Sequence, residues 1–237
     1  MPDPGQFPFS ILVGRAIRAN WPISLTLGSI AAAIIVSYYF VAPLRTPMEQ
    51  LAELKERYGL RFAIVSTGIF GGLLPLLIEQ FRSNPSRRLD RASLLFFTGF
   101  WGFKGAEIDL LYRGQALLFG DVASPGTVVA KVTVDMLIYV PLWAIPSVVI
   151  AYLWLDNSFD YRRTLGSLGP KWYRHRILPV MVMNWIIWVP AVTVIYSLPL
   201  TLQLPVQNII LLLFAIVLLF MTAPGPQESA GLRRQTS

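Results

Sequence analysis

Oppositely charged residues stand at helical spacing within or beside long apolar stretches of the chain. The three pairs are Lys104 with Glu107, Asp109 with Arg113, and Lys131 with Asp135. Residues three or four apart share one face of a helix. A charge near the centre of a bilayer costs about 2.5–3.5 kcal/mol on insertion scales, so such residues usually face a bundle interior or a water-filled path. The pairs therefore indicate either a polar pathway or structural ion pairs, and interfacial positions remain open for all three.

Other chemistry finds little support in the sequence. The chain has no cysteine, which excludes disulfides, thiolate nucleophiles and Cys-ligated metals. Its single histidine, His175, has no His or carboxylate partner at ligand spacing, so we interpret it as an interfacial residue. No HExxH, GxSxG or P-loop pattern occurs. We predict no enzyme activity, no metal site and no cofactor.

The elements that position the charged pairs are predicted from the stretches that lack charge. Of 237 residues, 54% are hydrophobic and 14% charged, with a mean hydropathy of +0.56. An ordinary soluble domain is about 25% charged. A helix needs roughly 20 apolar residues to cross a bilayer. Six candidate spans meet or approach this length, at about 20–42, 62–80, 92–113, 128–155, 177–198 and 205–222.

We therefore predict an all-α, polytopic membrane protein with about six transmembrane helices in one bundle, because unbroken apolar runs without alternation favour helices over a barrel. The membrane domain covers 20–222, between an N-terminal cytoplasmic segment, 1–19, and a disordered tail, 223–237. Two local alternatives stay open. The span at 92–113 could end near Lys104 and continue as an interfacial helix. Segment 45–61 suits either an amphipathic interfacial helix or a solvated connector.

The basic residues mark one side of the predicted membrane. Thirteen of them fall in the segments on the side of the N-terminus, and five in the opposite loops. The positive-inside rule then places both termini on the cytoplasmic or equivalent side. The net charge of +7 lies in short clusters beside the spans, so we expect anionic lipid headgroups as partners rather than nucleic acid. A homo-oligomer or a larger membrane complex is compatible with this arrangement.

Small residues predict where two of the helices pack. Gly68 and Gly72 form a small-xxx-small pair in one span, and Gly99, Gly102 and Gly105 follow a slowly rotating stripe in the next. Glycines let helix backbones approach closely, which matters in lipid because the bilayer offers no hydrophobic incentive for helices to associate. We expect both spans to pack against neighbours through these residues.

Several motif residues resemble those of a known family. They are Lys131, Asp135 and Pro141 at characteristic spacing, then Trp185, Trp188 and Pro190, and later Pro199. This pattern resembles the Mpv/PMP family of peroxisomal and mitochondrial inner-membrane proteins over about 57–222, with the first helix, 20–42, as an addition to a five-helix core. The chain departs from the family at Met136, where Gln is usual, and at Gln203, where Arg is usual. The resemblance implies a small organelle membrane protein linked to pore or channel activity. A bacterial plasma membrane stays open on the sequence.

Two functional hypotheses follow. The first is a pore or transport component for small solutes or ions, in which the intramembrane charges line or gate a polar route. The second is a non-conducting membrane scaffold or assembly factor, in which the same charges only fix helix packing. The two differ in whether the charged residues converge on a shared interior space.

Overall fold

The computed structural model describes residues 22, 25–30, 32–34, 36–81 and 90–221. Helices make up all the regular structure of these residues. In chain order they are Leu25–Phe40, α2 (Ala42–Tyr58), α3 (Leu60–Thr67), η2 (Gly68–Leu73), α4 (Leu74–Gln80), α5 (Arg91–Phe119), α6 (Pro125–Val134), η3 (Asp135–Ala144), α7 (Ile145–Asp156), α8 (Tyr161–Ser167), η4 (Tyr173–Ile177), α9 (Leu178–Tyr196) and α10 (Leu200–Met221), where η marks π-helix. The predicted terminal segments, 1–19 and 223–237, lie outside the described residues.

Within the described part of the chain, two helices are long and apolar enough to cross a membrane. Leu60–Gln80 runs through α3, η2 and α4, and Pro125–Asp156 runs through α6, η3 and α7. Leu25–Phe40 and α2 add a third if they count as one span, although they are bent by 100°. The prediction of an all-helical chain with membrane-crossing segments is confirmed at this level.

Judged by helix length and composition, the described residues form fewer membrane-crossing helices than the six that the sequence predicts. The predicted span 92–113 lies in α5, which carries too many charged residues to qualify as an apolar span. The predicted span 177–198 contains the apolar helix Val180–Tyr196, and the predicted span 205–222 overlaps the apolar helix Leu200–Ile216. Charge within α5 therefore accounts for one of the spans that are not counted.

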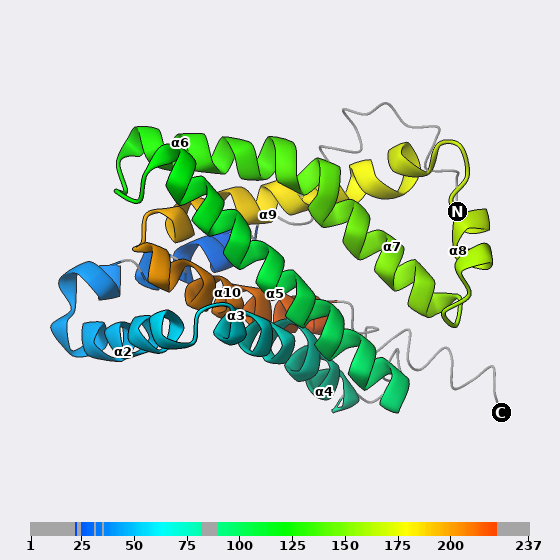
Figure 1. Ribbon diagram of the computed structural model, residues 1–237, viewed down its shortest axis with the longest axis horizontal. Helices are drawn as coiled ribbons and strands as arrows, with labels where there is room; N and C mark the ends of the chain where they lie inside the picture. The colour runs from blue at the N-terminus through cyan, green and yellow to red at the C-terminus, as the bar shows by residue number, and fades with distance from the viewer. Residues whose placement is uncertain (1–21, 23–24, 31, 35, 82–89, 222–237) are drawn as a thin grey trace.

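The helices form an elongated bundle (Figure 1). α5 crosses the bundle diagonally beside α3 and α4, and α6 continues through η3 into α7 along another face (Figure 1). α2 and the turn between α5 and α6 lie at one end, whereas α8 and the C-terminal ends of α4 and α7 lie at the other (Figure 1). Tyr39 donates a hydrogen bond of 3.1 Å to the carbonyl of Ser197, which places the turn between α9 and α10 beside the end of the first helix.

The boundaries of α5 have local causes. Asp90 precedes the helix with an extended backbone, and its carboxylate accepts a 2.7 Å hydrogen bond from the amide of Ser93. Gly120 ends the helix with a positive φ of 88°, which glycine tolerates best. The 29 residues between these caps span about 43 Å at 1.5 Å per residue. α5 is thus longer than the roughly 30 Å hydrocarbon core of a bilayer.

Glycines allow α5 to approach α3 and η2 closely. A Cβ atom at Gly105 would lie 2.3 Å from the carbonyl oxygen of Ala63, and one at Gly72 would lie 2.4 Å from that of Phe97. Gly68 and Gly102 face each other at the same crossing, where a Cβ on Gly68 would be 3.6 Å from the Cα of Gly102. These four predicted glycines therefore share one interface.

Gly99 differs from the prediction, because a Cβ there would meet nothing within 4 Å. The slow rotation of its stripe carries Gly99 off the crossing. Gly71, which stands beside Gly72 in the sequence, also packs closely, since a Cβ on it would come within 2.8 Å of the Trp101 ring.

Segment 45–61 is mostly helical, since α2 covers it as far as Tyr58. One side chain of α2, that of Lys55, is buried in the bundle at 5% exposure.

Candidate functional site: an interior cavity with two polar clusters

A cavity of about 510 Å³ lies between the helices of the bundle and is open to the outside along part of its wall, where Val180 and Met183 are exposed. Its wall is contributed mainly by α5, η3, α7, α9 and α10, and most of the lining is aliphatic or aromatic. The polar groups in this wall come from Lys104, Tyr112, Asp135, Tyr139, Asn184 and Gln207, besides the aromatic polar atoms of Trp101, Tyr152 and Trp188. Mostly apolar cavities with a few placed polar groups are typical of small-molecule sites.

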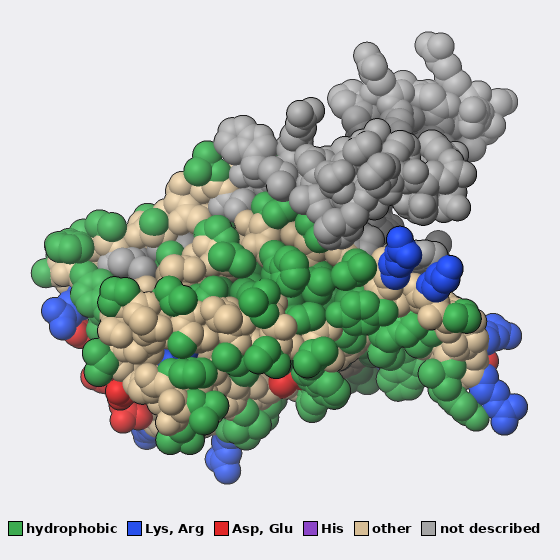
Figure 2. Space-filling model, turned by 90° about the horizontal axis from the view of Figure 1, so that it is seen from above, with side chains coloured by type: hydrophobic (Ala, Val, Ile, Leu, Met, Phe, Trp, Pro, Cys, Tyr) green, Lys and Arg blue, Asp and Glu red, His purple; other side chains and the backbone are tan. Residues whose placement is uncertain are grey.

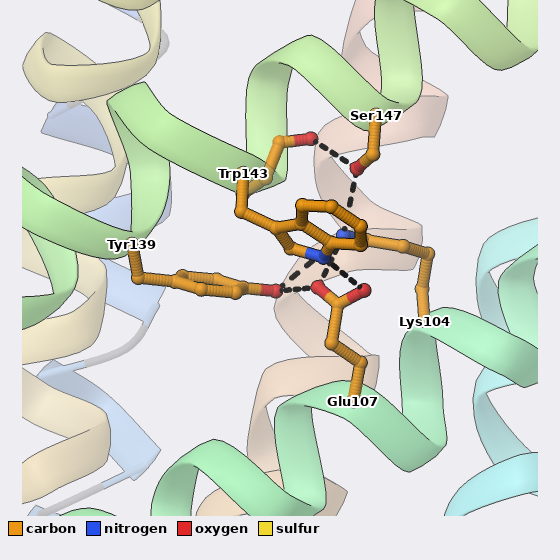
Figure 3. A network of polar contacts seen from close by, with 6 residues as sticks. Lys104, Glu107, Tyr139, Trp143 and Ser147 are labelled. Atoms are coloured by element: carbon orange, nitrogen blue, oxygen red, sulfur yellow. Dashed lines mark hydrogen bonds and ion pairs between the residues drawn. The ribbon is translucent and has the colours of Figure 1, made fainter.

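The first polar cluster surrounds Lys104, which lies near the middle of α5 and is 3% exposed (Figure 3). Its ammonium donates to Glu107, to Ser147 Oγ at 3.2 Å and to Tyr139 Oη at 3.4 Å. Glu107 also accepts hydrogen bonds from Tyr139 and, at 2.7 Å, from the indole of Trp143. Each of the three ammonium protons has an acceptor, and the pair carries no net charge.

A second cluster lies around Asp135, at the start of η3. Asp135 Oδ2 accepts a 2.8 Å hydrogen bond from Tyr196, whose hydroxyl accepts one of 3.1 Å from Gln115. Tyr112 donates to Gln207, and its ring packs edge-to-face on Tyr196 with centroids 5.3 Å apart. α5, η3, α9 and α10 therefore meet at this carboxylate.

The expected pair of Lys131 and Asp135 does not form among the described residues. Lys131 is 1% exposed, and the carboxylate whose charge acts on it is that of Asp121, in the turn before α6. Helical i, i+4 spacing permits an ion pair but does not require one, and the Asp135 carboxylate binds Tyr196 instead.

Asp109 lies apart from the cavity wall. Its carboxylate is 2.5 Å from Lys55 Nζ and 2.9 Å from Arg113 Nε, with the second contact lacking the angles of a hydrogen bond. Lys55 was not predicted as a site residue. It does share a helix face with Met48 and Ala52, which pack on the core, and this position among apolar neighbours was a usable signal.

The π-helical segment η3 explains the structural roles of the motif residues Pro141 and Trp185. In a π-helix the carbonyl of residue i bonds the amide of residue i+5. For Met136 this residue is Pro141, and for Pro141 it is Pro146, and neither proline has an N–H. The indole of Trp185 donates to Met136 O at 2.8 Å. Pro141 O accepts a 2.9 Å hydrogen bond from the hydroxyl of Tyr173.

The remaining motif residues shape the surroundings of the cavity. Trp188 lines it and packs against Phe214 at 6.1 Å between ring centroids. Pro190 lies within α9, facing the backbone of Gly28 in the first helix. Pro199 precedes α10, and its carbonyl accepts from Leu202.

Asn184, which the sequence did not single out, lines the cavity with a buried Oδ1 that has no hydrogen-bond donor among the described residues. Buried polar atoms without partners are uncommon, and each calls for an explanation. A local sequence pattern could not have found it, since the signal is the lack of a tertiary partner.

Comparison with known proteins finds no matching family model, no similar curated protein and no similar solved structure. The resemblance to the Mpv/PMP family therefore rests on the motif residues alone.

Proposed function

We propose that this chain is a six-span membrane protein that carries small solutes or ions across the bilayer through its interior cavity. The observation that carries the proposal is the cavity, because two polar clusters from predicted intramembrane positions, at Lys104 and Asp135, contribute to one wall. Polar groups in the membrane are costly and usually mark substrate paths or relays. Lys104 is buried in the bundle, and Glu107 is its acceptor there, which supports the proposal.

Six crossings are supported by the lengths of the remaining helices. α9 has 19 residues and α10 has 22, about 28 and 33 Å long at 1.5 Å per residue. α5 is longer still, and the charges in its second half are paired within the protein. Hydrophobic side chains are spread over the visible face of the molecule, and Lys and Arg side chains lie mainly near its two ends and at its lower edge (Figure 2).

The surface of α5 is consistent with contact to lipid. Leu95, Phe103, Leu110 and Leu117 are 56–89% exposed, although the opposite face of the same helix holds the buried ion pairs. A bilayer supplies the apolar environment that such side chains lack in water.

The orientation belongs to the same proposal. Thirteen basic residues lie on the side of the N-terminus and five on the opposite side, so both termini face the cytoplasm or its equivalent. The basic clusters on that side bind anionic lipid headgroups. If the resemblance to the Mpv/PMP family holds, the membrane is peroxisomal or mitochondrial inner membrane.

The test is solute flux through purified protein in liposomes, with conductance measured in parallel. Val148→Phe adds bulk to the cavity wall and should reduce flux strongly. Val129→Phe is the matched control, because Val129 is 65% exposed and does not line the cavity. Folded protein without flux or conductance would overturn the proposal, as would equal flux from both variants.

A non-conducting scaffold or assembly factor is the second candidate. The pair of Lys55 with Asp109 favours it, since this pair ties α2 to α5 away from the cavity. A scaffold, as an oligomer or in a membrane complex, should give no flux. It should lose assembly, measured by native gel, when this pair is broken.

A further inference from the structure

The wall of the cavity has an unbalanced charge. The ammonium of Lys104 is neutralised by Glu107 and has acceptors for all three of its protons. The carboxylate of Asp135 has no cation among the described residues, because Lys131 forms no ion pair with it. Of the charged groups that line the cavity, Asp135 alone is thus uncompensated.

The same wall has hydrogen-bond acceptors without donors. Asp135 accepts one hydrogen bond, from Tyr196 at Oδ2, and none reaches Oδ1 from the described residues. Asn184 Oδ1 is buried and has no donor. A buried carboxylate with a single hydrogen bond is unfavourable unless a cation or further donors reach it. Asp135 lines the cavity, so an occupant of the cavity is placed to supply what its carboxylate lacks.

The rest of the wall suits an apolar body and an aromatic environment for a cation. Aliphatic side chains dominate the lining, and the rings of Trp101, Tyr139, Tyr152 and Trp188 contribute to it. Aromatic faces attract cations, most strongly where water is excluded. An anion would meet Asp135 with no free cationic group, since Lys104 is already fully bonded.

From this charge balance we infer that the cavity binds an amphipathic or lipophilic organic cation, with its charge beside Asp135 and its apolar part against the aromatic wall. The inference rests on the proposed function, in that the cavity is the solute site, and it names the chemical class of the solute. A cation completes the charge of the wall.

The test uses two lipophilic ions of matched shape and opposite charge, tetraphenylphosphonium and tetraphenylborate. Saturable binding of each to the full chain in nanodiscs is measured against empty nanodiscs. Tetraphenylphosphonium should bind at one site, and Asp135→Asn should weaken it by about tenfold or more, as expected for the loss of a poorly solvated charge contact worth at least 1.4 kcal/mol. Tyr196→Phe keeps the carboxylate and should retain the binding, and Asp135→Glu should restore most of it.

The outcomes separate this inference from the proposed function. Equal binding of both ions, or binding of the cation that Asp135→Asn leaves unchanged, would overturn the inference while leaving flux of other solutes intact. Cation binding without any flux would uphold the inference and overturn transport. If Asp135→Asn does not fold, thermal stabilisation of the unaltered protein decides, since the cation should raise its unfolding temperature more than the borate does.

Discussion

The indole nitrogen of Trp185 in α9 lies 2.8 Å from the carbonyl oxygen of Met136, five residues before Pro141. This contact gives Met136 O the hydrogen-bond donor that the π-helical backbone cannot supply. The hydroxyl of Tyr173 likewise donates to the carbonyl oxygen of Pro141. Two prolines five residues apart therefore leave two carbonyls open, and neighbouring side chains close both. Non-standard backbone within a membrane is tolerated where other parts of the protein satisfy it in this way.

Removal of the Trp185 donor should destabilise the bundle. Trp185→Phe leaves Met136 O without its side-chain donor in an apolar setting, and we expect a loss of about 1–2 kcal/mol in the free energy of unfolding. Trp188→Phe is the control, because Trp188 makes no side-chain hydrogen bond among the described residues. The measurement is reversible unfolding in mixed micelles. Equal losses in the two variants would show that ring volume, not the hydrogen bond, matters.

Restoring the backbone donor should make Trp185 less important. Pro141→Ala provides an N–H five residues after Met136, where the π-helical register places it. We expect Trp185→Phe to lose about 0.5–1 kcal/mol less in the Pro141→Ala background than in the original chain. A double-mutant cycle of unfolding free energies measures this coupling, and additive effects would contradict the account of η3.

The sequence predicted the helical class and the membrane-crossing runs because apolar length is a local property of the chain. It also placed four glycines whose spacing lets one helix face meet another, at Gly68, Gly72, Gly102 and Gly105. The partner of a given polar group is a tertiary property. Tyr196 lies 61 residues from Asp135, and no local spacing connects them.

Spacing along one helix gave wrong ion-pair partners where a side chain could reach a partner in another segment. Lys131 was paired with Asp135 because they are four residues apart, although both have surroundings set by other segments. Lys55 lies in the segment predicted as an amphipathic helix or a connector, and its position on the apolar face of α2 carries it to Asp109. The π-helix could have been anticipated only from Pro141 and Pro146, since residues five apart match its repeat.

Lys55→Met should be strongly destabilising. Asp109 would keep only Arg113, whose side chain is 48% exposed, as its cationic partner. Breaking a buried pair from one side typically costs about 3–5 kcal/mol. The double variant Lys55→Met with Asp109→Leu removes both charges and should recover most of that loss in the free energy of unfolding. If the double variant is no more stable than the single one, the pair does more than satisfy charge.

Acid should loosen the first turn of α5. The hydrogen bond from the amide of Ser93 lowers the pKa of Asp90 below its ordinary value of 3.8. A lowered pKa in the folded state means that the ionised cap stabilises the helix above about pH 3.8, and that this contribution is lost as the pH falls through the lowered pKa. The protection of the Ser93 and Leu94 amides against hydrogen exchange, corrected for the intrinsic pH dependence of exchange, should therefore fall on acidification. In Asp90→Ala this protection should be low already near neutral pH, and a pH response equal to that of the unaltered chain would contradict the role of the cap.

A methyl group should separate α3 from α5 at one glycine of the stripe and not at another. In Gly105→Ala the new Cβ would lie 2.3 Å from the Ala63 carbonyl and 2.6 Å from Thr67, both on a helix that cannot give way locally. Overpacking of this kind costs about 1–3 kcal/mol or more. Gly99→Ala introduces the same atom into open space on the same helix. It should be neutral or stabilise by up to about 1 kcal/mol, because alanine favours helix over glycine. If the crossing is as described, the free energy of unfolding falls in Gly105→Ala and does not fall in Gly99→Ala. Equal losses would mean that glycine at these positions serves the helix itself, not the contact.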